Sequence, residues 1–312
     1  MLEHTTQYRY IAFGLIISSE ILLPELQPIS HSVGKVDVEI KIDDRVNYKE
    51  ELADNPYEHI VKDHAVLFFI PDHAFFSISD GRTITIFSLP EADYDLIRLY
   101  ILGSCMGALL MQRSIYPLHG SAVEIDGKAY AFIGESGAGK STLASTFLKQ
   151  GYRLVSDDVI AISLSPYDHS PIVTPSYPQQ KLWQESLDHL GMDEHRYHSI
   201  FGREKKYAIP VSTSYYTEPL PLAGIFELGK SDSEQIDFRP IKKLERFKTL
   251  VTHTYRNFLI PQLGLREWHF STSASIMKHV DMYYIRRTVV GFSASQLADF
   301  IHDTISRRNH YV

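Results

Sequence analysis

One eight-residue stretch limits what this chain can fold into more than any other feature. Residues 134–141 read Gly-Glu-Ser-Gly-Ala-Gly-Lys-Ser and fit the phosphate-loop pattern G-x-x-x-x-G-K-[ST] at every fixed position. The apolar run 129–133 before the loop predicts a strand, and residues 141–150 after it predict a helix that stops at Gly151. A phosphate loop needs this order of strand, loop and helix, so we expect the chain to bind the phosphates of a nucleotide.

The residue types in the loop have separate chemical roles. Glycines let backbone N–H groups turn inward around a polyphosphate, and the helix N-terminus adds a dipole that favours an anion. Lys140 can reach the β- and γ-phosphates, and the Ser141 hydroxyl can ligate Mg²⁺. The predicted nucleotide-binding residues are Gly134, Glu135, Ser136, Gly137, Ala138, Gly139, Lys140, Ser141 and Thr142.

Composition and charge exclude several classes of protein. Hydrophobic residues make up 44% of the 312 residues and charged residues 22%, which is typical of a globular protein with a substantial core. The formal charge of −7 argues against a nucleic-acid binder and provides no basic segment for a membrane surface. Cys105 is the single cysteine, so an internal disulfide is excluded, and its apolar neighbours predict a buried thiol on a helix.

Neither of the two apolar runs reads as a targeting or membrane segment. The run 11–17 has no basic region before it and Glu20 soon after it, unlike a signal peptide. The run 101–111 is too short to cross a bilayer. We therefore expect a cytoplasmic protein with no membrane partner and no nucleic-acid partner, and a homo-oligomer is compatible with these features.

The first ninety residues predict a smaller β-rich module, which we place at residues 1–90. Strands are predicted at 8–18, 36–42, 66–70, 74–79 and 83–87, with a hairpin turn at Asp80-Gly81-Arg82. We interpret the module as structural. The alternative is a docking sheet whose edge captures an extended substrate.

Residues 91–312 predict an α/β catalytic domain around the phosphate loop. A long helix is predicted from Pro90 to about Arg113, followed by two strands joined at Asp126-Gly127. These two strands are predicted at 118–125 and 128–133. Beyond the loop we expect strands at 152–156, 159–164, 207–211 and 222–228, helices at 182–190, 244–255 and 294–305, and a connection at 166–178.

Two adjacent acids and one histidine are the candidate catalytic residues. Asp157 and Asp158 follow the phosphate loop by one helix and one strand, and a kinase needs an acid for Mg²⁺ and a base for the incoming hydroxyl. The backbone can bend at a strand end, so that both carboxylates reach one site although successive strand residues point to opposite faces. His119 lies beside the same predicted sheet and could handle a proton near a phosphate.

These residues carry a resemblance to a known family. His119-Gly120, the loop 134–141 and Leu154-Val155-Ser156-Asp157-Asp158 resemble the catalytic domain of HPr kinase/phosphorylase. The resemblance implies a phosphate-loop core like that of phosphoenolpyruvate carboxykinase, and transfer of phosphate from ATP with Mg²⁺ to a serine of a protein. It also implies that Lys140 binds the phosphates, Ser141 and Asp157 hold the metal, and Asp158 acts as base with support from His119. Which aspartate takes which role stays open.

The chain also departs from the HPr kinases. Their later Glu-x-Arg-Gly-Leu-Gly signature has only a faint counterpart at residues 225–230, so HPr as substrate and the reverse reaction are not predicted. A narrower resemblance is to the HPr-kinase-like proteins of peptide-modification gene clusters, including lasso peptide precursor kinases that phosphorylate a terminal serine. It rests on Phe13-Gly14-Leu15, Leu23-Pro24-Glu25-Leu26 and Lys181-Leu182-Trp183.

Three functions remain after the sequence is read. The leading hypothesis is an ATP-dependent serine kinase that acts on a peptide or protein, with a precursor peptide C-terminus as the substrate. A small-molecule kinase on the same core and a nucleotide sensor without transfer are the alternatives. We interpret Trp183 as a core residue. We interpret four basic residues as part of a solvated loop, and the alternative is that they capture an anionic group of the substrate. The four are Lys181, Arg203, Lys205 and Lys206.

Overall fold

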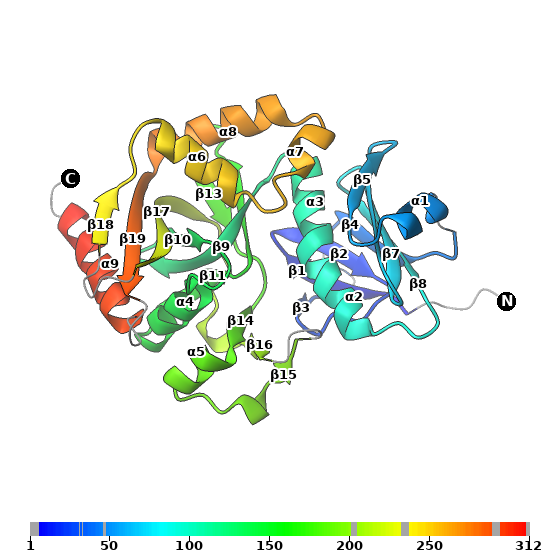
Figure 1. The fold of residues 1–312 in the computed structure, drawn as a ribbon, viewed down its shortest axis with the longest axis horizontal. Coiled ribbons are helices and arrows are strands. Elements are labelled where there is room, and N and C mark those ends of the chain that lie inside the picture. The colour runs from blue at the N-terminus through cyan, green and yellow to red at the C-terminus, as the bar shows by residue number, and fades with distance from the viewer. Residues whose placement is uncertain are drawn as a thin grey trace.

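The computed structural model of the chain describes residues 6–30, 32, 34–45, 48–200, 205–231, 237–288 and 294–309. Within these residues the strands form two eight-stranded sheets and one three-stranded sheet, and helices lie between and around them (Figure 1). The predicted mixed α/β class is therefore confirmed.

The first sheet is built where the sequence predicts a β-rich region. Its strand order is β3-β1-β2-β4-β8-β7-β6-β5. The strands are β1 (Tyr8–Ala12), β2 (Leu15–Ser19), β3 (Gln27–Pro28), β4 (Val38–Ile42), β5 (His59–Lys62), β6 (Ala65–Ile70), β7 (Ala74–Ser79) and β8 (Thr83–Ser88), and the short helix α1 is Lys49–Asp54. The predicted hairpin of β7 and β8 is confirmed, since Asp80 and Gly81 take the positive φ angles of turn residues.

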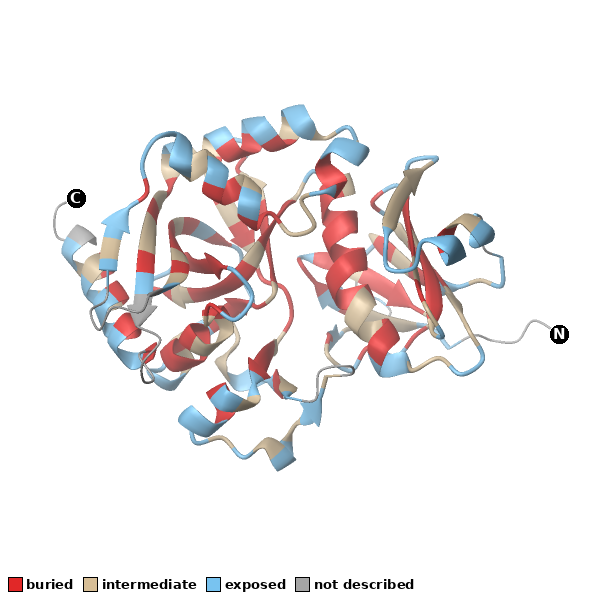
Figure 2. Ribbon diagram, in the orientation of Figure 1, coloured by how far each residue is buried: buried red, intermediate tan, exposed pale blue. Residues whose placement is uncertain are grey.

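A long helix packs on this first sheet. It runs through α2 (Tyr94–Tyr100), a π-helical segment η1 (Ile101–Cys105) and α3 (Met106–Gln112). The helix begins at Tyr94 rather than at Pro90, because the Asp93 carboxylate caps it by accepting hydrogen bonds from two backbone N–H groups. Figure 2 shows how little of it is exposed. Cys105 is fully buried there, as the sequence predicts.

The burial of this helix explains its apolar composition. Helix Tyr94–Gln112 passes the length and hydropathy test for a membrane span among the described residues, and it is longer than the apolar run 101–111. However, 72% of its apolar window is buried inside the molecule, which is the pattern of a core helix. Its side chains share one apolar cluster with those of the first sheet. The division of the chain at residue 90 stays a prediction.

The second sheet carries the phosphate loop. Its order is β10-β9-β12-β13-β17-β19-β18, with β11 also paired to β9, and a parallel β10–β17 pairing closes five of these strands into a ring. The strands are β9 (Tyr116–Ile125), β10 (Lys128–Gly134), β11 (Arg153–Ser156), β12 (Val159–Leu164), β13 (Pro171–Thr174), β17 (Leu220–Ser231), β18 (Asp237–Pro240) and β19 (Asp281–Thr288). The predicted turn between β9 and β10 is confirmed, because Asp126 and Gly127 both take positive φ, as a two-residue hairpin requires.

Helices cover both faces of the second sheet. On one face, α4 (Lys140–Lys149) packs with α9 (Ala294–Asn309), and Phe147 and Ile301 are fully buried between them and the sheet. On the other, α6 (Leu244–His253) packs with α8 (Arg266–His279), while α7 (Leu259–Gln262) reaches the core of the first sheet (Figure 1). The segment between α6 and α7 therefore joins the two halves of the molecule.

A small third sheet lies below α4 in the view of Figure 1. It consists of β14 (Gln179–Trp183), β16 (Lys206–Pro210) and β15 (His198–Ser199), and α5 (Gln184–His189) follows β14. The short helices η2 (Glu194–Arg196) and η3 (Ser212–Ser214) complete the described elements. The predicted helix 182–190 is wrong for Leu182 and Trp183, because both lie in β14, where they pair with β16.

Three further differences from the sequence prediction have physical reasons. The connection 166–178 contains β13, a strand of four residues that begins at Pro171 and is too short to leave an alternating pattern. Helix α8 was not predicted because three of its buried residues are polar, namely His269, Thr272 and Ser273, and they interrupt the apolar periodicity. Strand β19 was also missed, since its apolar residues are flanked by charged ones.

Candidate functional site

The predicted site residues surround one cavity of about 750 Å³. The cavity wall includes His119, Lys140, Asp157 and Asp158 and every residue of the predicted loop 134–142 except Ala138, which is buried in the core beside α4. The opposite wall comes from the long helix on the first sheet and from the segment after α6. The cavity thus lies between the second sheet, the third sheet and the long helix.

The loop has the shape of a phosphate cradle. Gly134, Gly137 and Gly139 have φ angles of 143°, 79° and 100°, a region that other residues rarely adopt. A Cβ at Gly134 would lie 2.5 Å from the carbonyl oxygen of Leu228, so only glycine fits between β10 and β17. Helix α4 begins at Lys140, directly after the loop, and its N-terminus faces the cavity as an anion site requires.

Lys140 lies across the mouth of this cradle. Its Nζ donates hydrogen bonds to the carbonyl oxygens of Gly134 at 2.8 Å and Glu135 at 3.1 Å. Burial lowers the pKa of Lys140, and the negative charges of Asp158 and Asp157 partly offset that effect. The ammonium group is therefore held in place by the loop itself and faces the acids.

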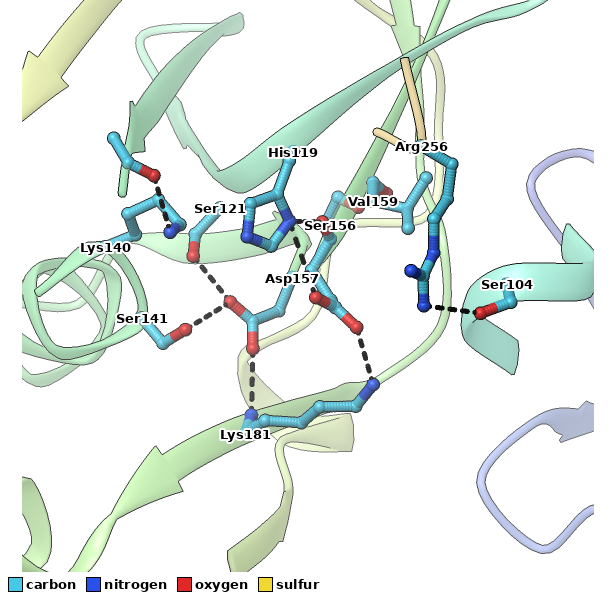
Figure 3. Close-up of polar contacts among 12 residues, drawn as sticks. Ser104, His119, Ser121, Lys140, Ser141, Ser156, Asp157, Val159, Lys181 and Arg256 are labelled. Carbon is cyan, nitrogen blue, oxygen red and sulfur yellow. Dashed lines mark hydrogen bonds and ion pairs between the residues drawn. The ribbon is translucent and has the colours of Figure 1, made fainter. Parts of the chain in front are cut away.

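Asp157 is fixed by three donors. Its Oδ1 accepts hydrogen bonds from the hydroxyls of Ser141 (2.8 Å) and Ser121, and its Oδ2 accepts one from the backbone N–H of Lys181 at 2.8 Å. The carboxylate is only 4% exposed. Ser141 at the start of α4 and Asp157 at the end of β11 thus bring two oxygen ligands to one point, as Figure 3 shows.

Asp158 points its carboxylate to a different pair of partners. Its φ of 72° bends the chain after β11, so both acids line the cavity. Its Oδ2 lies 2.7 Å from Nζ of Lys181, and its Oδ1 lies 3.6 Å from Nδ1 of His119. Burial opposes ionisation and is the largest single effect, but the charges of Lys181 and His119 and the hydrogen bond from Lys181 together outweigh it and hold the pKa of Asp158 well below its usual range.

His119 is held against the backbone of the same aspartate. Its Nδ1–H donates to the carbonyl oxygen of Asp158 at 2.9 Å, which leaves Nε2 as the other ring nitrogen. Burial is the main cause that lowers the pKa of His119, although the charge of Asp158 works against it. The ring also lies 5.6 Å from that of Tyr255, centroid to centroid.

The interpretation of Lys181 as part of a solvated basic loop is wrong. Lys181 lies on β14, its side chain is 9% exposed, and it binds both acids, one through its backbone N–H and the other through Nζ. Lys205 is exposed as expected, Lys206 lines the cavity, and Arg203 lies outside the described residues. The error arose because the pairing of β14 with β16 is not visible in the sequence.

The interpretation of Trp183 as a core residue is also wrong. Its side chain is 40% exposed and lines the cavity, two residues after Lys181 on the same face of β14. The Nζ of Lys206 lies 5.5 Å from the centroid of its ring, within the range of a cation–π contact. Nothing in the local sequence distinguishes this tryptophan from a buried one.

Several cavity residues were not predicted at all. Ser104 comes from the π-helical segment of the long helix, and Tyr255 and Arg256 come from the segment after α6. Ser104 precedes the phosphate loop, Tyr255 and Arg256 follow it by more than a hundred positions, and none of the three belongs to a motif. Only their convergence on the cavity identifies them.

The donor set suits a cation that is bound together with phosphates. Among the described residues no group of three or more His, Cys, Asp or Glu side chains could hold a metal. Mg²⁺ does not need such a group, because it is usually bound by one or two carboxylates plus substrate phosphates and waters. The hard oxygens of Ser141 and Asp157, which point to one place beside the phosphate cradle, fit that requirement.

Comparisons with known proteins agree with this geometry over a short segment. The HPr kinase/phosphorylase 1 of Oceanobacillus iheyensis is 45% identical over 51 residues, 16% of this chain and 16% of the relative. The HPr kinase/phosphorylase of Thermoanaerobacter pseudethanolicus is 46% identical over 46 residues, 15% of each chain. Over this segment the chain is similar to HPr kinase/phosphorylases. The resemblance that the sequence motifs predict is confirmed, and the narrower one to lasso precursor kinases stays a prediction.

The other comparisons add little to this HPr kinase-like assignment. The match spans about one sixth of the curated relatives' length. No family model matches the chain. The HPr(Ser) kinase/phosphatase from Coxiella burnetii aligns over 62% of this chain and 95% of its own at 16% identity, but the TM-score is 0.31, which does not establish a shared fold.

Proposed function

We propose that the protein is a kinase that uses ATP and Mg²⁺ to phosphorylate a serine hydroxyl of a peptide or protein. The observation that carries the proposal is the meeting of three features at one cavity: the cradle with Lys140, the Ser141–Asp157 oxygen pair, and the ionised Asp158. Phosphoryl transfer requires a polyphosphate site, a hard-cation site and a group that orients the hydroxyl.

The proposed transfer can be written as a balanced step in which each of these residues has one role. A bond forms between the serine Oγ and the γ-phosphorus, and the bond to the bridging oxygen breaks, so that the electron pair leaves with ADP. Asp158 accepts the hydroxyl proton. Lys140 stabilises the negative charge on the transferred group, and Mg²⁺, when bound by Ser141 and Asp157, supplies further charge neutralisation.

The low pKa of Asp158 defines its contribution. A carboxylate that Lys181 keeps ionised is a weak base, but it is always ready to accept a hydrogen bond from the incoming hydroxyl. Phosphoryl transfer passes through a loose transition state in most analyses, so little basicity is needed before the bond to phosphorus forms. Asp158 therefore orients the hydroxyl first and takes the proton late, while His119 supports the Asp158 backbone.

The substrate we propose is the C-terminal serine of a ribosomally made precursor peptide of the lasso type. The narrower sequence resemblance motivates this choice, and a cavity of about 750 Å³ has room for phosphates and a peptide end. The proposed compartment is the cytoplasm, where ATP is available, with no nucleic-acid or membrane partner and with a homo-oligomer compatible with the site.

The test is transfer from labelled ATP to peptides. Purified protein with Mg²⁺ is incubated with a library of random peptides that end in serine, and phosphate is located by mass spectrometry. We expect phosphoserine with the natural protein and none with Asp158→Asn. Labelling of small alcohols alone would favour the small-molecule kinase, and binding of ATP with no transfer to either would favour the nucleotide sensor.

A further inference from the structure

The far end of the cavity contains a cation that the transfer chemistry does not use. Arg256 lines the cavity together with Ser104, and in Figure 3 both lie on the opposite side of Asp157 from Lys140 and Ser141. The guanidinium NH2 group donates one hydrogen bond to the Ser104 hydroxyl at 2.8 Å. The acids therefore separate this arginine from the phosphate loop.

Arg256 has no acidic partner among the described residues. The ion pairs of the described residues use other cations, and even the nearby Asp158 is paired with Lys181 rather than with Arg256. Its Nε is buried and forms no hydrogen bond. The guanidinium also contacts the ring of Tyr255, whose centroid lies 5.7 Å from Cζ, and no ion pair among the described residues uses its charge.

The positive charge of Arg256 acts on titratable groups of several elements around it. Burial first, and the charge of Arg256 second, lower the pKa of His59 to about 4. The same charge opposes the effect of burial on the pKa of Cys105 and of Tyr255. The guanidinium is therefore close to the first sheet, the long helix and the segment after α6.

The backbone around Arg256 is built to hold it in this place. Arg256 has a φ of 52°, which is costly for a residue with a side chain and is typical of functional positions. The ring of the preceding Tyr255 packs closely against the long helix at Gly107. A Cβ at Gly107 would lie 2.6 Å from Cδ1 of the ring, so only glycine leaves room for it. The helix is π-helical at Ser104, an irregularity that is frequent at functional sites.

We propose that Arg256 binds a carboxylate of the acceptor, next to the hydroxyl that receives the phosphate. This inference rests on the proposed function and assigns a specificity-determining residue to it. A planar guanidinium matches a carboxylate through two parallel hydrogen bonds, and its two terminal nitrogens, NH1 and NH2, form one such edge. The phosphates of ATP are bound at the other end of the cavity, so the anion at Arg256 belongs to the acceptor.

The experiment compares three peptide libraries that differ only after the serine. One ends in serine with a free carboxylate, the second ends in serine amide, and the third ends in Ser-Asp amide, which offers a side-chain carboxylate instead of a terminal one. With the natural protein we expect kcat/KM for the free acid to exceed that for the amide by about 10- to 100-fold. The third library shows whether the carboxylate is that of the chain end or of a neighbouring residue.

Matched variants separate recognition from a structural role. Arg256→Gln should lower kcat/KM for the free acid to that for the amide, so that the preference for the acid disappears, and Arg256→Lys should restore part of the preference. Ser104→Ala, which removes the hydrogen bond but keeps the guanidinium, should retain the preference. An unchanged ratio of acid to amide in Arg256→Gln would overturn the proposal.

A second measurement does not depend on transfer. Phenylglyoxal modifies arginine side chains, and the rate at Arg256 is followed by mass spectrometry with each of the first two libraries present. Slower modification with the free acid than with the amide supports the Arg256 site even if no peptide is phosphorylated, in which case only the kinase proposal fails. Equal rates with both libraries reject the Arg256 site whatever the transfer experiment shows.

Discussion

The two ends of the cavity are built in opposite ways. At the phosphate end, the cradle and Lys140 come from consecutive residues between β10 and α4. At the acceptor end, Lys181, Trp183, Ser104 and Arg256 come from the third sheet, the long helix and the segment after α6. The two acids lie between these ends and contact both, because Asp157 binds Ser141 and Asp158 binds Lys181.

The difference between the two ends reflects what each must bind. A polyphosphate is the same in every nucleotide, so one local arrangement of backbone N–H groups suffices to bind it. An acceptor differs from one enzyme to another, and side chains from several elements are needed to shape its site. We therefore expect changes at the phosphate end to affect the rate with every acceptor, and changes at the acceptor end to affect selectivity or local stability.

The largest effect is expected from Asp158→Asn, at the junction of the two ends. An amide cannot take the hydroxyl proton, so transfer should fall by about 10²- to 10⁴-fold. The amide oxygen can still accept a hydrogen bond from Lys181, so the protein should still fold and bind nucleotide, although its stability should fall because the buried Lys181 charge loses its counter-charge. Rates of transfer and ATP titrations measure both effects.

Asp157→Asn is the matched control for that variant. A neutral oxygen is a poorer ligand for Mg²⁺, so its main effect should be a higher Mg²⁺ requirement rather than loss of transfer at saturating metal. If Asp158→Asn shifts the Mg²⁺ requirement and Asp157→Asn does not, the roles of the two aspartates are reversed.

Lys140→Ala tests the phosphate end alone. Removing one charge that acts on the transferred group is expected to lower the rate by about 10²- to 10³-fold. The loss should be equal for the acid and amide peptides, since Lys140 does not face the acceptor. Steady-state rates with both peptides check this, and a variant that changes only their ratio would contradict the separation of the two ends.

Lys181→Met tests how the acceptor end is held together. Removal of one partner of a largely buried ion pair is expected to destabilise the protein by about 3 kcal/mol, because the Asp158 carboxylate loses its counter-charge. In an Asp158→Asn background the same change should cost less, since no charge is left unpaired. Urea denaturation of all four proteins measures the difference, and equal costs in both backgrounds would show that the pair is not coupled.

A smaller effect on stability is expected from pH, through a buried histidine that contacts the segment after α6. Nε2 of His269 lies 2.8 Å from the hydroxyl of Thr254, which directly precedes Tyr255 and Arg256 in the chain. Burial lowers the pKa of His269 to about 4. An unfolded histidine titrates near 6.5, so the unfolded chain binds more protons between these values. Stability is then complete above about pH 6.5 and is lost as the pH falls toward 4, by about 2 kcal/mol at pH 5.

The variant His269→Gln separates this residue from general acid effects. The difference in unfolding free energy between pH 7 and pH 5 should shrink by about 2 kcal/mol in the variant. The exposed His195→Gln serves as the control and should behave like the natural protein. If both variants respond to pH equally, His269 does not carry the acid sensitivity.

The sequence by itself predicted the phosphate end and the elements around it. The loop pattern requires consecutive residues, and the turns at Asp80-Gly81 and Asp126-Gly127 depend on local backbone conformations, so each could be read without knowing the fold. The acids at positions 157 and 158 were found because they follow the loop at a short distance. Their individual roles stay predictions.

Only the tertiary structure decided the acceptor end. Lys181 appeared to be a solvated residue until the pairing of β14 with β16 placed it on Asp158, and Trp183 appeared to be core until the same strand turned it toward the cavity. Arg256 and Ser104 are 152 positions apart and meet because α6 and α7 bring one segment onto the long helix. The physical reason is range: backbone conformation and short motifs depend on neighbours in the sequence, whereas burial and charge pairing depend on elements that only the folded chain brings together.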